Sequence, residues 1–363
     1  MPRGFALACA AVSVAWYGSA QGAGSFGTYG NAWRGIDAPA VAPGSFNSKG
    51  AALADGRLVA ATGLGVYVET GVGTGQFTLA ATLDSALVGG GTDPAFLSVS
   101  PDGSRIALGA GYDFGAGATR PVVVFDTALL AGGGAVIDGS NASAFDVQHY
   151  EAAWADNTRL ALTAGDFGSP ARVDLLDVTG ATSVRTIVSG IEGASSGIAF
   201  DAFGNLYTGN GFASGAGSAT GAIRAFSSAA WDGAGAVDFE SGGVLVGEML
   251  SASGLAFDGA GNLFVGGGDF GDGDFGYLGV VAAEAVADAL AGLGAFSLVD
   301  ASSVRMLDPV GSGGAFYDLV YNAATGELVA IDGASWFATI PAPGAGFALV
   351  GGLLLVGGRR RAA

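Results

Sequence analysis

Gly197-Ile-Ala-Phe-Asp-Ala-Phe-Gly-Asn-Leu-Tyr-Thr208 and Gly254-Leu-Ala-Phe-Asp-Gly-Ala-Gly-Asn-Leu-Phe-Val265 are two copies of one pattern. In each copy a short apolar run leads into a turn of Asp, Gly and Asn, and a second apolar run follows. The same order occurs six times along the 363 residues. Repeats of this kind indicate a solenoid, a propeller or an array of small units. The repeat therefore decides the fold class.

The first apolar residue of each second run is a marker that measures the repeat length. Consecutive markers are 48, 54, 46, 57 and 65 residues apart, near or above the roughly 40–50 residues of four-stranded propeller blades. The markers are Leu58, Ile106, Leu160, Leu206, Leu263 and Leu328. Turn pairs such as Asp55-Gly56 and Gly204-Asn205 precede them and suit tight hairpins. We predict an all-β, six-bladed propeller with the markers in equivalent second strands.

Further apolar runs complete the predicted blades. Third strands are expected at residues 122–125, 173–176, 223–226 and 277–281, and fourth strands at 135–138 and 236–239. The Ala-rich residues 282–291 favour a helix, and a helical turn is expected between strands three and four. Seven blades are the alternative, because residues 24–48 could supply strands that close the ring with the last blade. A β-sandwich or β-helix fits less well, since neither repeats one hairpin at these spacings.

The repeat resembles that of NHL-type and SMP-30/gluconolactonase-like propellers, and the Ser-Pro-Asp-Gly stretch within residues 98–107 resembles the related TolB/WD-like blade. The resemblance covers about residues 50–340. It implies an architecture, because such propellers host unrelated functions. The gluconolactonase-like resemblance also implies a metal-dependent lactonase with Glu, Asp and Asn ligands around the channel. Residues near the appropriate loops do not map onto the family's ligand motif; they are Glu151, Glu192, Asn210 and Glu248.

Residues 1–20 have the pattern of a secretory signal peptide. Arg3 supplies the positive start, residues 5–16 an apolar core, and residues 18–20 the small side chains before a cleavage site. The only cysteine, Cys9, lies inside that apolar core. The mature protein is therefore expected to have no disulfides and no thiol chemistry.

The last residues, 340–363, have a second targeting pattern. A Pro-Ala-Pro motif precedes an apolar stretch at 344–358, and three arginines follow it. The stretch is shorter than the ~20 residues of a permanent span, and such arginines stay on the cytoplasmic side. The residues of the predicted signal are Pro341, Pro343, Arg359, Arg360 and Arg361.

This C-terminal pattern resembles the PEP-CTERM sorting signal that exosortases process in Gram-negative bacteria. Ala342 stands where that motif has Glu, which leaves open which exosortase-like enzyme would cleave there. A plain C-terminal anchor is the alternative. With a sorting signal, the propeller, placed at residues 24–340, is expected to be anchored transiently in the inner membrane and exported to the cell envelope or extracellular matrix. With either signal, it is expected to face outward from the inner membrane.

The chain is strongly acidic, with a net charge of −18 from 14 basic and 32 acidic residues. Removal of both predicted signals takes away four arginines and leaves 10 basic residues against 32 acidic ones, a charge of −22. Such a surface repels phosphates, which argues against nucleic-acid binding. Lys49 is the only lysine.

Three loops after strand two contain Asp-Phe-Gly, once at Asp113, once at Asp166 and twice in the third loop, at Asp269 and Asp274. Together with Asp272 and Asp274, Asp269 forms the best local set of carboxylate oxygens for Ca²⁺. The alternative is that each aspartate hydrogen-bonds the backbone of its own turn. Asp269, Asp272 and Asp274 are the predicted metal ligands, and Ca²⁺ is the predicted ion.

A serine motif and the sole histidine are the remaining catalytic candidates. Gly193-Ala-Ser-Ser-Gly197 matches the nucleophile-elbow motif, but a strand follows it instead of the required helix, so an esterase is rejected. The sole histidine, His149, could act as a lone acid or base beside Glu151, or could be an ordinary satisfied histidine. We therefore expect no catalytic residues.

Taken together, the patterns predict an exported, non-enzymatic binding or scaffold module of the cell surface. Extracellular polysaccharide is an expected partner. The alternative is a metal-dependent hydrolase of the lactonase type, for which three or four oxygen ligands would have to converge at the mouth of the channel.

Overall fold

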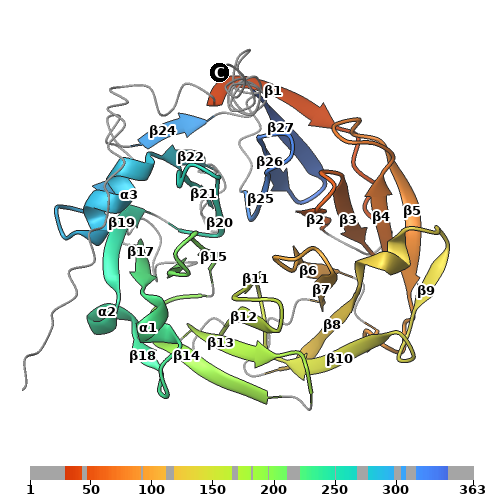
Figure 1. The fold of residues 1–363 in the computed structure, drawn as a ribbon, viewed down its shortest axis with the longest axis horizontal. Coiled ribbons are helices and arrows are strands. Elements are labelled where there is room, and N and C mark those ends of the chain that lie inside the picture. Colours follow the sequence, from red (N-terminus) through yellow and green to blue (C-terminus); the bar gives the residue numbers. More distant parts are fainter. Residues whose placement is uncertain are drawn as a thin grey trace, which may run out of the picture.

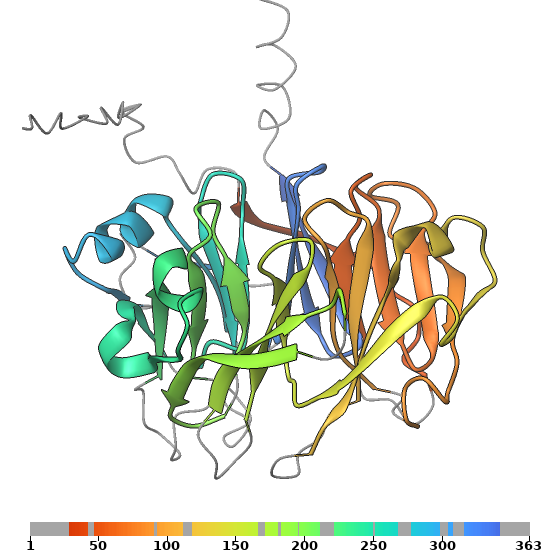
Figure 2. The ribbon, with the colours of Figure 1, turned by 60° about the horizontal axis from the view of Figure 1, so that its bottom comes forward.

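Six β-sheets stand around a central axis, and each sheet is one blade (Figure 1). The computed structural model describes residues 29–42, 47–90, 93–111, 118–165, 171–180, 183–194, 196–210, 221–249, 251–267, 277–297, 304–307 and 316–341. The first strand of each blade lies nearest the axis and the later strands lie further out (Figure 1), and Figure 2 shows the same ring tilted. The chain is therefore a mostly β, six-bladed propeller.

The first three blades follow one another along the chain. Blade one contains β2 (Lys49–Ala52), β3 (Leu58–Thr62), β4 (Gly65–Glu69) and β5 (Phe77–Leu83). Blade two contains β6 (Pro94–Val99), β7 (Arg105–Ala110), β8 (Arg120–Asp126) and β10 (Ala142–Val147). Blade three contains β11 (Ala152–Trp154), β12 (Arg159–Ala164), β13 (Ala171–Asp177) and β14 (Ser183–Ile191).

The last three blades continue this order. Blade four contains β15 (Ile198–Phe200), β16 (Leu206–Gly209), β17 (Gly221–Phe226) and β19 (Val244–Met249). Blade five contains β20 (Gly254–Phe257), β21 (Leu263–Gly267), β22 (Tyr277–Val281) and β24 (Val304–Leu307). Blade six contains β25 (Asp318–Asn322), β26 (Glu327–Asp332), β27 (Ser335–Pro341) and, from the other end of the chain, β1 (Tyr29–Ile36).

The six markers lie at equivalent places, as predicted. Each is the first or second residue of a second strand, in β3, β7, β12, β16, β21 and β26. All six are at most 2% exposed. Burial of such a side chain stabilises the fold by roughly 1.5–3 kcal/mol, so the repeated apolar residue fixes which face of each sheet turns inward.

The polar residues of the repeat close its own hairpin turn. Asp201 accepts hydrogen bonds from the N–H groups of Phe203 at 2.8 Å and Asn205 at 2.9 Å, and Gly204 has a φ of 77°. Asp258 makes the same bonds in blade five. The Asp/Gly/Asn pattern is thus turn chemistry, which explains its recurrence without a ligand.

The third strands were predicted correctly, but both predicted fourth strands were wrong. Residues 135–137 form β9 (Ala135–Ile137), which pairs in parallel with β5 of the preceding blade. Residues 237–238 form β18 (Val237–Asp238), which pairs in parallel with β14 of the preceding blade. The true fourth strands, β10 and β19, follow a few residues later. Both runs belong to connectors that reach across to a neighbouring sheet.

Short helices lie in these connectors, between the third and fourth strands, as expected. They are η1 (Thr127–Leu130), α1 (Ser228–Trp231), α2 (Phe239–Gly242) and α3 (Ala283–Leu290), with β23 (Phe296–Ser297) pairing in parallel with β19. Asp126 and Ser227 cap η1 and α1 by accepting hydrogen bonds from backbone N–H groups two and three residues on.

The N-terminal strand closes the ring, which settles six blades against seven. β1 pairs antiparallel with β27, from Tyr29 opposite Pro341 to Ile36 opposite Trp336. Residues 29–36 thus do close the ring with the last blade, but as the fourth strand of blade six and not in the seven-bladed arrangement of the alternative. A bidentate ion pair adds to the ladder, because Arg34 donates to both carboxylate oxygens of Glu327 at 3.1 and 3.0 Å.

Trp336 joins the last blade to the first. It is 2% exposed, packs edge-on against Phe77 with ring centroids 5.8 Å apart, and donates from Nε1 to Ser48 Oγ at 2.7 Å. A Cβ atom at Gly50 would lie 2.5 Å from the Trp336 ring. Glycine is therefore required there for the indole to fit.

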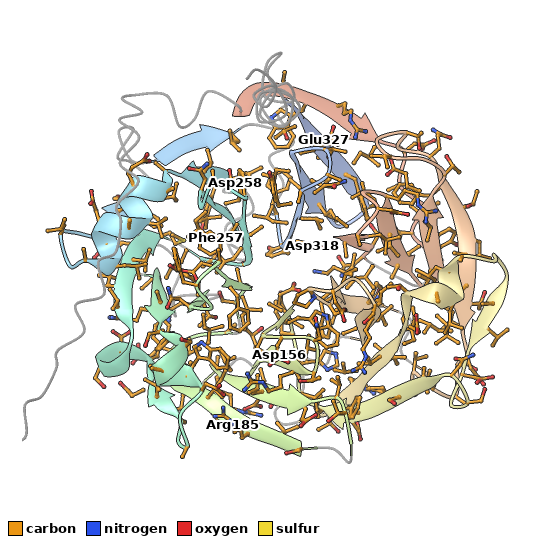
Figure 3. All side chains as sticks on the ribbon, in the orientation of Figure 1. Asp156, Arg185, Phe257, Asp258, Asp318 and Glu327 are labelled. Carbon is orange, nitrogen blue, oxygen red and sulfur yellow. The ribbon has the colours of Figure 1, made fainter. Side chains whose placement is uncertain are left out.

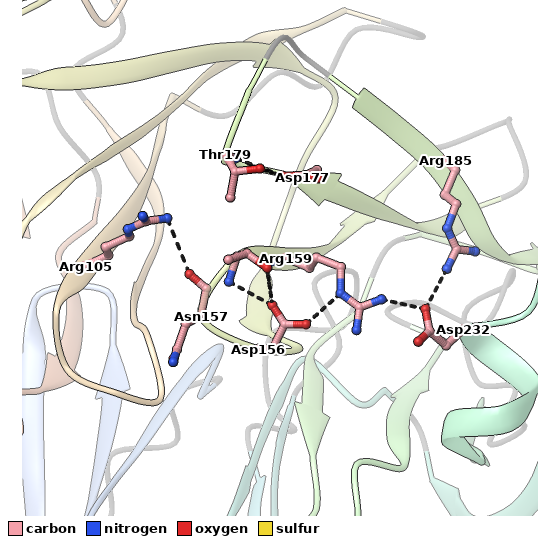
Figure 4. Close-up of polar contacts among 9 residues, drawn as sticks. Arg105, Asp156, Asn157, Arg159, Asp177, Thr179, Arg185 and Asp232 are labelled. Carbon is pink, nitrogen blue, oxygen red and sulfur yellow. Dashed lines mark hydrogen bonds and ion pairs between the residues drawn. The ribbon is translucent and has the colours of Figure 1, made fainter.

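An ionic network joins blades three and four (Figure 4). Arg159 of β12 donates to Asp156 and to Asp232, both at 2.6 Å, and Asp232 directly follows α1. Arg185 of β14 donates to the same Asp232 oxygen at 3.1 Å. All four side chains are 31–42% exposed, so screening keeps the contribution of each pair small.

Both predicted targeting segments lie at the chain ends. Residues 1–20 and 342–363, including Pro343 and the three arginines, are outside the described residues. Pro341 is the last residue of β27. Within the described part of the chain, no helix is long and apolar enough to cross a membrane.

Candidate functional site at the mouth of the central channel

Six equivalent residues form one mouth of the central channel, one from the beginning of each first strand. Each marker residue pairs with one residue of the first strand of its blade, and the mouth residue lies three positions before that paired residue. The paired residues are Ala52, Val99, Trp154, Phe200, Phe257 and Tyr321. The mouth residues are therefore Lys49, Phe96, Glu151, Gly197, Gly254 and Asp318. Three of the six blades bring an ionisable side chain to this ring.

Lys49 and Glu151 form an ion pair between blades one and three. Lys49 Nζ lies 3.5 Å from Glu151 Oε2, and the two side chains are 5% and 13% exposed. Glu151 Oε1 accepts a hydrogen bond from the N–H of Ala152 at 3.2 Å. Oε2 is buried and has no hydrogen-bond partner besides this long ion pair. The carboxyl group can therefore accept a further donor.

Asp318 brings a second carboxyl group from blade six, which adjoins blade one. Its Oδ2 accepts from the N–H of Gly50 at 2.9 Å, and the residue is 9% exposed. Figure 3 shows Asp318 beside the central channel. The three charged groups thus come from three blades and share one poorly hydrated region.

Burial changes the protonation of this cluster. It raises the pKa of Glu151 to about 8, because the charge of Lys49 offsets the loss of hydration only in part and Asp318 opposes ionisation. Burial likewise raises the pKa of Asp318, against the opposing effects of Lys49 and the Gly50 N–H. The cluster can therefore hold a proton at neutral pH, which a carboxyl group in water would have lost.

The opposite side of the mouth is made of glycine and serine. A Cβ atom at Gly197 would lie 2.8 Å from the carbonyl oxygen of Ser253, so the first strands of blades four and five approach closely there. Ser196 is 1% exposed and donates to the carbonyl of Ala252. This side offers backbone and hydroxyl groups already engaged in structure.

A cavity of about 270 Å³ runs along the first strands of all six blades. Glu151 and Asp318 line it at the mouth, and Val99, Phe200 and Tyr321 line it further along. At ~30 Å³ per water molecule in the liquid, the volume corresponds to about nine waters. It is slightly below the range of typical small-molecule sites, so a ligand here would be small.

His149 is buried, and only one of its two ring nitrogens is hydrogen-bonded. Its Nδ1 lies 3.1 Å from the carbonyl of Val147 and donates to it, and the ring packs edge-on against Phe96 at 5.4 Å. Burial lowers its pKa to about 4, so the imidazole is neutral. Nε2 is buried without a hydrogen-bond partner and would lie 2.7 Å from a Cβ atom at Gly109, so a neighbouring strand blocks it.

The structure does not bring together the residues considered for a lactonase. Glu151 lines the channel, but Glu192 and Glu248 are exposed, and Glu248 lies in the fourth strand β19, away from the axis. The Asn210 amide is occupied, because it donates to the carbonyl of Glu192 at 2.7 Å and accepts from the N–H of Ala222 at 3.0 Å.

The predicted Ca²⁺ ligands Asp269, Asp272 and Asp274 lie outside the described residues, as do Asp113 and Asp166. Among the residues that are described, no three His, Cys, Asp or Glu side chains gather as a metal site would require. The calcium prediction for these loops therefore stays a prediction.

Sequence reasoning passed over Lys49 and Asp318. Each lies three residues before the partner of a marker, as Glu151 does, so the hairpin register could have found them together. The solitary occurrence of lysine was a second signal, since the one lysine of the chain stands in the channel mouth.

Known proteins resemble this chain in fold alone. The sequence matches no protein-family model and no curated protein. Among solved structures, a gluconolactonase of Xanthomonas campestris aligns at 14% identity and TM-score 0.49, over 88% of this chain and 92% of that one. A chain of the mitotic checkpoint complex aligns at 13% identity and TM-score 0.50, over 84% and 94%. TolB of Acinetobacter baumannii aligns at 13% identity and TM-score 0.41, over 66% of this chain but only 52% of TolB. The chain is thus a six-bladed propeller that distantly resembles gluconolactonase and other propeller structures.

Proposed function

We propose that this chain is an exported β-propeller of the bacterial cell envelope that acts as a non-enzymatic binding or scaffold module. The observation that carries the export part is the extent of the ring. Its strands run from Tyr29 to Pro341, so both predicted targeting segments, 1–20 and 342–363, fall outside them. Cleavage after residue 20 and beyond Pro343 would leave every strand of the described residues in place. A ring that keeps its described strands after both cuts suits a protein processed at both ends.

The channel mouth supports a binding role over a catalytic one. Glu151 and Asp318 are the only two mouth residues with carboxyl groups, and Lys49 is the counter-charge of both. A lactonase-type hydrolase would need three or four carboxylate or amide oxygens of the protein around one cation, and here an ammonium group stands beside the two carboxyl groups. Extracellular polysaccharide is the proposed partner of the module, and the acidic surface argues against nucleic acid.

Intact-mass spectrometry of the native protein tests the export proposal. We expect a first residue near Gln21 and loss of the residues after about Pro343. A chain with Arg359–Arg361 deleted is expected to be retained less well at the inner membrane, because that basic cluster fixes orientation. Mature surface protein with an intact apolar tail would leave only the plain-anchor alternative.

Hydrolysis assays test the non-enzymatic part. The purified mature chain is expected to give no Ca²⁺-dependent hydrolysis of sugar lactones above a protein-free control. Hydrolysis that requires Ca²⁺ and disappears in Glu151→Gln would contradict the proposal and support the lactonase alternative. The exposed Glu248→Gln variant is the matched control, since its side chain is remote from the channel.

A further inference from the structure

The position of Lys49 is unusual for a lysine. Lysine normally lies on the surface and is almost never fully buried without a partner. This chain has 32 acidic residues but a single lysine, and that residue is 4% exposed in the channel mouth. A surface role in solubility or screening cannot explain this placement. An explanation must come from what surrounds the ammonium group.

The ammonium group lies beside two carboxyl groups from different blades. Glu151 Oε2 lies 3.5 Å from Nζ and has no hydrogen-bond partner of its own. The charge of Lys49 acts on both Glu151 and Asp318, favouring the ionised form of each. Carboxylates from separate strands that converge beside a cavity are also what a hard cation such as Ca²⁺ selects. In this chain a tethered ammonium group serves as the cation.

We propose that the Lys49 ammonium group stands in the place of a bound divalent cation at the channel mouth, and that replacing Lys49 by a neutral residue creates a Ca²⁺ site between Glu151 and Asp318. The wild-type mouth then binds no such ion, because a second cation would meet the ammonium charge. This proposal does not depend on export, processing or the polysaccharide partner.

Charge and space both favour this exchange. Without Lys49, two buried carboxylates would face each other with no counter-charge, and each would be costly to ionise. A divalent cation restores neutrality, while the cavity of about 270 Å³ has room for the waters that complete its coordination. Sodium carries half the compensating charge and is expected to bind more weakly.

The test compares thermal unfolding of Lys49→Met with that of the parent chain. Both carry Asp272→Asn and Asp274→Asn, so the acidic loop predicted from the sequence cannot contribute. At about pH 8.5 the variant is expected to be less stable than the parent without Ca²⁺ and to gain stability with it. For Kd values of roughly 10⁻⁴–10⁻³ M, 10 mM-scale Ca²⁺ raises the apparent folding constant about 10–100-fold.

Three matched variants make the result specific. Lys49→Arg keeps the tethered charge and is expected to respond no more than the parent. Adding Glu151→Gln or Asp318→Asn to Lys49→Met removes one ligand and should abolish the Ca²⁺ response. A folded Lys49→Met chain that does not respond to Ca²⁺ would overturn the proposal.

The parent chain provides an independent arm should Lys49→Met not fold. Calorimetric titration with Ca²⁺ is expected to give the same result for the parent and for its Glu151→Gln variant, because the ammonium group excludes the ion from both. Equal titrations support the proposal. Binding to the parent that Glu151→Gln removes would show that the mouth takes a cation beside Lys49, which overturns it.

Discussion

At the scale of single residues, two buried ionisable groups that are close in the sequence have pKa values shifted in opposite directions. His149 and Glu151 are two positions apart, and burial lowers the pKa of the first to about 4 and raises that of the second to about 8. Both shifts favour the neutral form, since a poorly hydrated site penalises charge of either sign. The two residues therefore give stability opposite dependences on pH, which variants can separate.

The imidazole of His149 should destabilise the fold in acid. Between about pH 6.5 and pH 4 the unfolded chain binds a proton that the folded chain does not, so stability is lost as pH falls. A shift of this size corresponds to about 3 kcal/mol. The His149→Asn variant keeps a donor for the Val147 carbonyl. Between pH 6.5 and pH 4 its unfolding free energy, measured in urea, is expected to fall by about 3 kcal/mol less than that of wild type. Parallel pH profiles would disprove the assignment.

The carboxyl group of Glu151 should act in the opposite direction. From about pH 4.5 to 8 the folded chain holds a proton that the unfolded chain has released, so stability falls as pH rises through this window. One proton changes the unfolding free energy by at most about 1.4 kcal/mol per pH unit. Glu151→Gln should remove this slope, and the exposed Glu248→Gln should retain it. A slope unchanged in Glu151→Gln would assign the proton elsewhere, with Asp318 the next candidate.

The sequence alone located only part of this cluster. Glu151 drew notice because it follows the sole histidine, whereas Lys49 and Asp318 stand in unremarkable local sequence, 102 residues before it and 167 after it. What joins them is ring closure, which places blade six beside blade one. Local sequence patterns carry no information on that contact. Counting the same number of residues back from the hairpin in every blade would have identified all three residues.

At the scale of elements, the connectors explain why the fourth strands were misplaced. β9, β18 and β23 are each two or three residues long and pair in parallel with the outer strand of the preceding blade. An apolar run of that length fits a fourth strand equally well, and periodicity cannot tell which sheet it joins. The pairing covers an otherwise open sheet edge, which is the usual protection against association.

Close packing between strands makes one glycine in β16 indispensable. A Cβ atom at Gly209 would lie 2.3 Å from the carbonyl oxygen of Ala222, and backbone cannot move as freely as a side chain. Gly209→Ala is therefore expected to lower the unfolding free energy by roughly 1–3 kcal/mol. Gly35→Ala in β1 is the matched control, since no atom lies within 4 Å of its Cβ position. Equal denaturant midpoints for the two variants would contradict this explanation.

At the scale of the whole molecule, the six hairpins could be predicted but the closure could not be fixed. Each marker and its turn are local, so six copies give six second strands. The choice between six and seven blades depended on where residues 24–48 pair, and their nearest partner, β27, lies about 300 residues away. Only the structure shows that they complete blade six.

The closing strand β1 should therefore decide whether the ring holds together. A chain that starts at residue 29 retains every strand that the structure describes and is expected to unfold like the chain that starts at Gln21. A chain that starts at residue 37 loses the ladder to β27 and the buried Ile36, and it leaves Glu327 without Arg34. The lost apolar burial and the unpaired carboxylate together should cost at least about 3 kcal/mol.

A peptide added in trans separates loss of this strand from general damage to the protein. A synthetic peptide of residues 24–40 should pair with the open edge of β27 and raise the melting temperature of the chain that starts at residue 37, in proportion to the logarithm of its concentration once it is in excess. A peptide with Arg34→Ala should rescue less, because it cannot pair with Glu327. If the chain that starts at residue 37 is as stable as the one that starts at residue 29, the ring closes without β1 and the strand does not stabilise it.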